Sequence, residues 1–211
     1  MPRGEQRGVQ AISDRATPPR AKALIRALES HYLSDVHTML RLPDVDRDLV
    51  AGCSFAIMQV LAAAVSGISV TLYSHIGGSR MRFKGLLQDY YPWAWDTGNA
   101  VTPQDGANVL YSVIRNPLTH DLGLDLENKR QGQKIVIKRL GTSKRKGLPE
   151  HFIEQLESPN RPTPMSPTVR VLSGKTVVLV EAFYWGVRQM VEQLSSDASR
   201  MRSAEVFLGS I

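Results

Sequence analysis

A long stretch without formal charge does more than any other feature to limit how this chain can fold. From Leu49 to Ser79 there is no Asp, Glu, Lys or Arg, and the part from Phe55 to Tyr73 is strongly apolar. A segment of this length and composition is either a membrane span or the central helix of a bundle. Small residues dominate its middle and the polar Gln59 lies within it, which favours a buried core helix or a dimer interface over a membrane span.

Composition fits one globular domain in a reducing compartment. Of the 211 residues, 42% are hydrophobic and 22% are charged, as in folded domains rather than disordered chains. The single cysteine, Cys53, excludes a disulfide framework and a cysteine-rich zinc site. We therefore expect a cytoplasmic protein without metal or cofactor, with a flexible tail over residues 1–18 and a single helical domain over residues 19–211. The alternative is a membrane-associated protein that is anchored by the uncharged segment.

Apolar residues at helical spacing predict a bundle of four to five helices. The start and stop signals place these helices at residues 19–41, 47–74, 79–90, 103–123 and 180–201. Thr102-Pro103 is a strong start for the fourth helix, and Pro117 should kink or break it. The aromatic loop over residues 91–95 could stack on bases, but packing under a loop is the favoured interpretation.

The segment from residue 124 to residue 175 departs from this helical pattern. Residues 133–140 and 169–180 read as strands, and Ser173-Gly174 makes a turn within the second of them. A short helix at residues 150–156 lies between the strands. The predicted fold is therefore mostly α, a helical bundle with a small insertion that contains a β-hairpin between the last two core helices.

The insertion is also the most basic part of the chain. No acidic residue lies between Asn128 and Pro149, whereas the whole chain has a formal net charge of +6. A basic arm of this kind can hold an RNA backbone, although a solvated loop or a contact for an acidic partner such as an antitoxin would have the same composition. The candidate nucleic-acid-binding residues are Lys129, Arg130, Lys138, Arg139, Lys144, Arg145 and Lys146, and Lys134 belongs to the same basic run.

Candidate catalytic residues lie in one short segment, from Arg115 to His120. None of the five histidines has the spacing of a metal ligand pair, and there is no phosphate-binding glycine loop. Cleavage of RNA without a metal needs a base for the ribose 2′-hydroxyl, a cation for the transition state and an acid for the leaving oxygen. His120 can transfer protons at neutral pH, Arg115 can bind phosphate oxygens, and Asn116 can orient either partner.

Regular helix geometry separates the two reactive groups of this motif. Five residues along an α-helix correspond to about 140° of rotation and roughly 7.5 Å of rise, so Arg115 and His120 do not share a face. A distortion at Pro117, or two copies of the motif that face each other across a dimer axis, would bring such groups together. The simpler alternative is a solvated arginine and a histidine favoured by the helix dipole.

The fourteen residues from Leu110 to Gly123 resemble the signature helix of the HEPN superfamily, which comprises small helical-bundle proteins whose active forms are metal-independent ribonucleases. Its motif is an Arg followed after four to six residues by a His, often with Asn directly after the Arg, and Arg115, Asn116 and His120 match it. The resemblance implies a homodimer with apposed motifs and RNA cleavage by 2′-hydroxyl attack that leaves a 2′,3′-cyclic phosphate.

The resemblance also implies a role in a toxin–antitoxin system, phage defence or RNA processing, with an antitoxin or other regulatory protein as a further partner. Two departures stand against it. Leu122 occupies a position where some members have Tyr, and the β-containing insertion is not part of the minimal bundle. Because many members lack activity, the alternative is a non-catalytic HEPN-like module that binds RNA or a partner protein.

Overall fold

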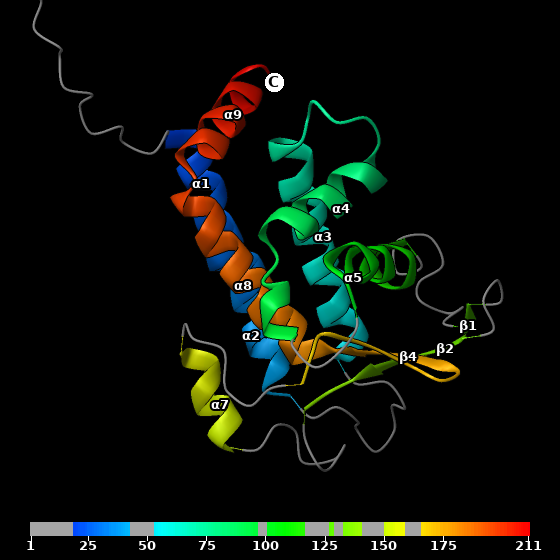
Figure 1. Ribbon diagram of the computed structural model, residues 1–211. Coiled ribbons are helices and arrows are strands. Elements are labelled where there is room, and N and C mark those ends of the chain that lie inside the picture. Colours follow the sequence, from blue (N-terminus) through cyan, green and yellow to red (C-terminus); the bar gives the residue numbers. More distant parts are fainter. Residues whose placement is uncertain are drawn as a thin grey trace, which may run out of the picture.

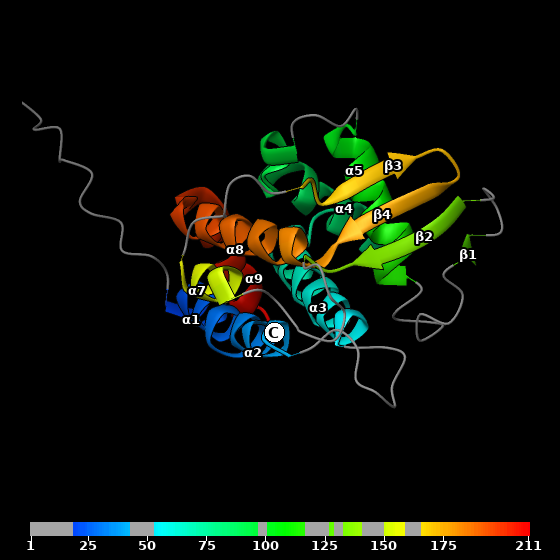
Figure 2. The same cartoon turned by 90° about the horizontal axis from the view of Figure 1, so that it is seen from below.

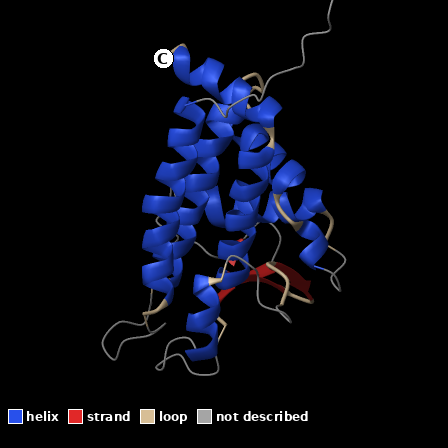
Figure 3. Ribbon diagram, turned by 90° about the vertical axis from the view of Figure 1, so that its left-hand side faces the viewer, coloured by secondary structure: helices blue, strands red, loops and turns tan. Residues whose placement is uncertain are grey.

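The computed structural model describes residues 19–42, 53–96, 101–116, 127–128, 133–140, 150–158 and 166–211. These residues form a mostly helical fold with a small sheet, as the sequence predicts (Figure 1). The long helices run side by side and the sheet lies near one end of them (Figure 3). The buried hydrophobic residues of the helices and of the inner sheet face form one continuous core.

The first helical stretch contains a π-helical turn in its middle. It consists of α1 (Pro19–Ala27), the π-helical η1 (Leu28–Leu33) and α2 (Ser34–Leu40), so its predicted extent is confirmed. Leu28 and Leu33 are both buried although they are five residues apart, a spacing that a π turn accommodates and a regular α-helix does not. Tyr32, which a regular α-helix would place above Leu28 on the buried face, is instead 45% exposed.

The uncharged segment forms the central helix, α3 (Ser54–Leu72). It packs against α2, α4, α8, α9 and η3, and most of its large apolar side chains are buried. By length and composition this helix could cross a membrane, and 56% of its most apolar 18-residue stretch is buried within the fold.

The aromatic loop follows α4 (Ser79–Tyr90), a helix with the predicted bounds, and continues into the short 3-10 helix η2 (Trp93–Asp96). Tyr91 is buried and shares a 2.6 Å hydrogen bond with the Thr168 hydroxyl, and the Trp93 indole N–H donates to the Leu87 carbonyl at 2.7 Å. A Cβ atom at Gly186 would lie 2.2 Å from the Tyr91 ring. Packing under the loop is therefore confirmed for Tyr91 and Trp93.

The small sheet has four strands in the order β1-β2-β4-β3. They are β1 (Glu127–Asn128), β2 (Gln133–Lys138), β3 (Val169–Leu172) and β4 (Lys175–Leu179). The predicted hairpin is confirmed: β3 and β4 are antiparallel, and Gly174 takes a φ of 71° in the turn. Strand β2 pairs with β4 in parallel, and α7 (Glu150–Glu157) lies between β2 and β3 in the chain.

The C-terminal region contains two helices where the sequence predicts one. Helix α8 (Val180–Ser196) ends at Asp197, and α9 (Ala198–Gly209) packs back against α1 and α3. The single helix expected over residues 180–201 is therefore wrong. Asp197 causes the break by capping α9, since its carboxylate accepts hydrogen bonds from the N–H groups of Ser199 and Arg200, each at 3.0 Å.

We expect this junction to weaken at acid pH. The Tyr90 hydroxyl donates to the Asp197 carboxylate at 2.5 Å, and this bond, together with the backbone N–H groups, lowers the pKa of Asp197 below its ordinary 3.8. A carboxylate with a lowered folded-state pKa stabilises the fold above its unfolded pKa, and that contribution is lost as pH falls through the folded value. Circular-dichroism melting of wild type and Asp197→Asn should therefore give a shallower loss of Tm below about pH 4 in the variant. Equal slopes in the two proteins would contradict this role.

Candidate nucleic-acid site

Arg115 and Asn116, the two described residues of the motif, lie where helix α5 has left regular α-helical geometry. Helix α5 (Pro103–Val109) starts as predicted, because the Thr102 hydroxyl accepts from the Asp105 N–H at 3.1 Å. It continues as the π-helical η3 (Leu110–Arg115), after which the Asn116 N–H bonds to the Tyr111 carbonyl. Wide turns of this kind are frequent at functional sites. The backbone therefore departs from the α-helix before Pro117, which lies outside the described residues.

The structure describes two of the three predicted catalytic residues. Arg115 is half-buried, and its guanidinium carbon lies 5.5 Å from the centroid of the Tyr111 ring. Asn116 follows it and is exposed. His120 lies outside the described residues, so its distance from Arg115 and the predicted distortion at Pro117 stay predictions.

Tyr111 links the motif to the neighbouring helix. The guanidinium of Arg80 in α4 lies 5.9 Å from the Tyr111 ring centroid, and the buried Phe83 meets the same ring edge-on at 5.6 Å. Two guanidinium groups, those of Arg80 and Arg115, therefore contact one aromatic ring, which holds both near the surface beside the motif. Neither Tyr111 nor Arg80 was among the predicted site residues, although Tyr111 lies four residues before Arg115 and thus one helical turn away.

The predicted basic residues divide into three groups. Lys134 and Lys138 are exposed on β2. Arg139, the next residue, is only 7% exposed and does not belong to the basic surface on which the sequence placed it. The remaining candidates lie outside the described residues: Lys129, Arg130, Lys144, Arg145 and Lys146.

Arg139 instead takes part in a buried polar network that ties the insertion to the bundle. Its Nε donates to the Glu181 carboxylate at 2.6 Å, and one of its terminal nitrogens donates to the Leu40 carbonyl at 2.5 Å. The second oxygen of Glu181 accepts from the Leu140 N–H at 2.8 Å. Burial raises the pKa of Glu181, while the Arg139 guanidinium acts in the opposite direction. Burial of Arg139 is a correction to the predicted exposed basic surface: this residue directly follows the last residue of β2, and its guanidinium turns to the buried Glu181 while Lys138 stays exposed.

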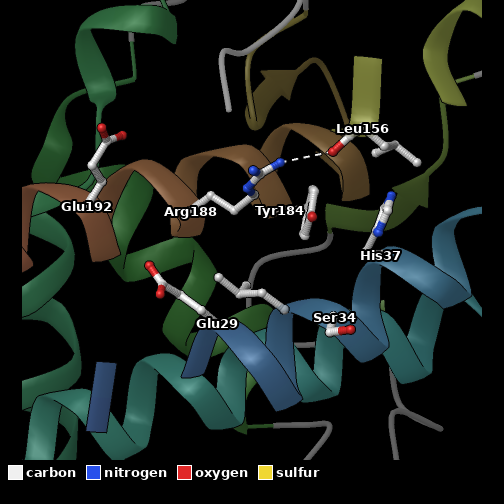
Figure 4. A pocket seen from close by; sticks show the side chains of 8 residues that line it. Glu29, Ser34, His37, Leu156, Tyr184, Arg188 and Glu192 are labelled. Atoms are coloured by element: carbon white, nitrogen blue, oxygen red, sulfur yellow. Dashed lines mark hydrogen bonds between the residues drawn. The ribbon is translucent and has the colours of Figure 1, made fainter. Parts of the chain in front are cut away.

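A polar hollow of about 570 Å³ lies between the first helical stretch, α7 and α8 (Figure 4). Arg188 crosses it, with its guanidinium 5.5 Å from the Tyr184 ring centroid and one nitrogen donating to the carbonyls of Leu156 and Ser158 at 3.0 Å. Arg188 therefore holds the C-terminal end of α7 against α8. None of the predicted site residues that the structure describes lines this hollow. Its walls come from separate segments that no sequence motif connects: Glu29, Leu33, Ser34, His37, Leu156, Tyr184, Arg188 and Glu192.

Comparison with known proteins finds no relative of this chain. No family model matches it, and neither the curated proteins nor the solved structures contain a significant match. Within the part of the chain that the structure describes, no group of three or more His, Cys, Asp or Glu side chains is placed to hold a metal ion.

Proposed function

We propose that this protein is a metal-independent endoribonuclease of HEPN type, with Arg115, Asn116 and His120 as its active-site residues. The observation that carries the proposal is the position of Arg115, which ends a π-helical turn and shares the Tyr111 ring with a second arginine, Arg80, while Asn116 directly follows it. The mostly helical frame and the exposed cations of the sheet are consistent with it.

In the proposed reaction each residue has a separate task. His120 removes the proton from the ribose 2′-hydroxyl, whose oxygen attacks the adjacent phosphorus, and the bond to the 5′-oxygen breaks. The leaving 5′-oxygen takes up a proton, and the products carry a 2′,3′-cyclic phosphate and a 5′-hydroxyl. Arg115 stabilises the additional negative charge on the phosphate oxygens, and Asn116 orients the phosphate or the histidine.

A homodimer with apposed motifs completes this site. One histidine per motif can act as base or as acid, but a two-fold axis beside the motif supplies a second histidine and a second arginine to the same cleft. The dimer also removes the difficulty that Arg115 and His120 do not share a face of a regular helix.

The test of this proposal is cleavage of RNA by the purified full-length protein in the presence of EDTA. We expect endonucleolytic products with 2′,3′-cyclic phosphate ends, because attack by the 2′-hydroxyl first produces this end on the upstream fragment. The ends are identified by their resistance to phosphatase until acid opens the ring. An RNA whose 2′-hydroxyls are replaced by hydrogen should not be cut. Absence of cleavage, or cleavage of that deoxy substrate, would contradict the proposal and favour a non-catalytic module that binds RNA or a partner protein.

A further inference from the structure

The small sheet has two faces of opposite character. On the inner face, Ile135, Thr176, Val178 and Val169 are buried against the helices. The alternate residues point away from them, and the side chains of Lys134, Lys138, Arg170 and Lys175 are all exposed. Figure 2 looks onto this outer side, with the strands in front of the helices. In the described strands the outer face therefore carries four cations from three different strands.

The strand register places these cations close together. Lys134 of β2 pairs directly with Lys175 of β4, so these two side chains are neighbours on one face. Lys138 lies four residues further along β2, about 13 Å away, and Arg170 of β3 pairs with Val177 on the far side of β4. The one acidic residue within the described strands is Glu127, which pairs with Lys134 at the β1 edge. The patch therefore combines a like-charge neighbour pair with two further cations.

Like charges directly across a strand pairing repel each other. An anionic partner that bridges the two ammonium groups would remove this repulsion. Between Lys138 and Arg170 the same face is hollowed by about 100 Å³, with Val177 and Leu179 among the residues that line it. Arg139 also lines this hollow, and cationic groups on both sides of it suit a phosphate group.

We propose that the outer face of the sheet, made by Lys134, Lys138, Arg170 and Lys175, binds the phosphate backbone of single-stranded RNA without regard to sequence. The inference rests on the proposed function for the identity of the polyanion. Its chemistry is that of phosphate contacts alone, because the apolar residues between the cations are valine and leucine and offer no ring on which a base could stack. Arg170 and Lys175 are new members of the site, and they lie outside the basic run of the sequence.

The experiment measures binding of an uncleavable probe, a 2′-O-methyl oligouridine of about 20 nucleotides, to the full-length protein. This probe lacks a free 2′-hydroxyl, so its binding is independent of any cleavage. We compare the triple variant Lys138→Gln, Arg170→Gln, Lys175→Gln with a control triple variant on α1 and α9, in which the equally exposed Lys22, Arg26 and Arg202 become Gln. Loss of three phosphate contacts should weaken binding roughly tenfold or more at low salt. It should also make the logarithm of the association constant less dependent on the logarithm of the salt concentration, with a slope smaller in magnitude by about 2.

The outcomes separate this inference from the proposed ribonuclease. Weaker binding and a smaller salt slope in the sheet variant alone support the surface, even if the wild type cleaves no RNA. Unchanged affinity and slope in the sheet variant, or an equal loss in the control, would overturn it even if RNA is cleaved normally. Tighter binding to vesicles of anionic phospholipid than to the oligonucleotide would also overturn it and assign the face to a membrane surface.

Discussion

We expect His120→Ala to cleave RNA about 10²–10⁴-fold more slowly than the wild type, the usual contribution of a positioned acid or base. Arg115→Ala should lose a comparable factor, and Arg115→Lys should recover only part of it, because an ammonium keeps the charge but not the two-pronged donation to phosphate oxygens. The measurement is the initial rate of cleavage of a defined RNA in EDTA. His31→Ala is the matched control, since His31 is an exposed histidine on a helix remote in sequence from the motif. If His120→Ala keeps full activity while His31→Ala loses it, the assigned base is wrong.

Mixing the two inactive variants tests whether the site is shared between two copies. If Arg115 of one chain acts with His120 of the other, an Arg115→Ala/His120→Ala mixed dimer keeps one of the two Arg–His pairs in the shared cleft. Random exchange makes half of the dimers mixed, so the mixture should recover at most about a quarter of the wild-type rate. If both residues of a site come from the same chain, the mixture stays inactive. Circular dichroism of each variant shows whether the loss of the Arg115 contact with Tyr111 has altered the fold.

The largest stability effect is expected at the buried pair of Arg139 and Glu181. The side chain of Glu181 is fully buried and that of Arg139 is 5% exposed, so Glu181→Ala leaves a cation in the core with half of its partners removed. Loss of one member of such a pair costs about 3–5 kcal/mol of unfolding free energy. Urea denaturation followed by circular dichroism measures this cost. Glu192→Ala on the exposed side of the same helix is the control and should change the unfolding free energy by less than about 0.5 kcal/mol.

A double replacement separates the loss of the pair from the penalty of an unpaired charge. With Arg139→Met and Glu181→Leu together, neither charge remains, and the cost of desolvating two ions also disappears. We expect the double variant to be more stable than either single variant and close to the wild type. A double variant as unstable as Glu181→Ala would mean that the bonds to Leu40 and Leu140, rather than the charge balance, hold the insertion in place.

Sequence patterns predicted correctly those caps, turns and helix ends that depend on residues close to them in the chain. The Thr102 cap, the turn at Ser173-Gly174 and the bounds of α4 follow from side chains that act within a few residues of their position. The break at Asp197 had a local signal too, a capping Asp, but the apolar positions continue past it at helical spacing. The continuing apolar positions concealed the change of direction, which depends on packing against α1 and α3.

The candidate site was less accessible to sequence reasoning because it is assembled from distant parts of the chain. The parallel pairing of β2 with β4 brings Lys134 beside Lys175, a neighbour relation that no local pattern contains. The assignment of Arg139 to the exposed basic surface was wrong because its guanidinium bonds to the buried Glu181, a partner that is distant in the chain. The contact between Arg80 and Tyr111 depends on the packing of α4 against η3.

The buried pair has a consequence for how β2 finds its partner. A shift of β2 by one residue would turn Lys138 inward and Arg139 outward, because successive side chains in a strand alternate between faces. Glu181 would then face a shorter, unbranched ammonium side chain in place of a forked guanidinium, without the bond from Arg139 to the Leu40 carbonyl. The same shift would also move Lys134 and Lys138 from solvent to the face on which Ile135 is buried, so the apolar pattern opposes it as well. The buried Arg139 therefore adds to the apolar pattern of β2 in selecting one alignment of this strand, and that alignment fixes which charges the sheet presents to solvent.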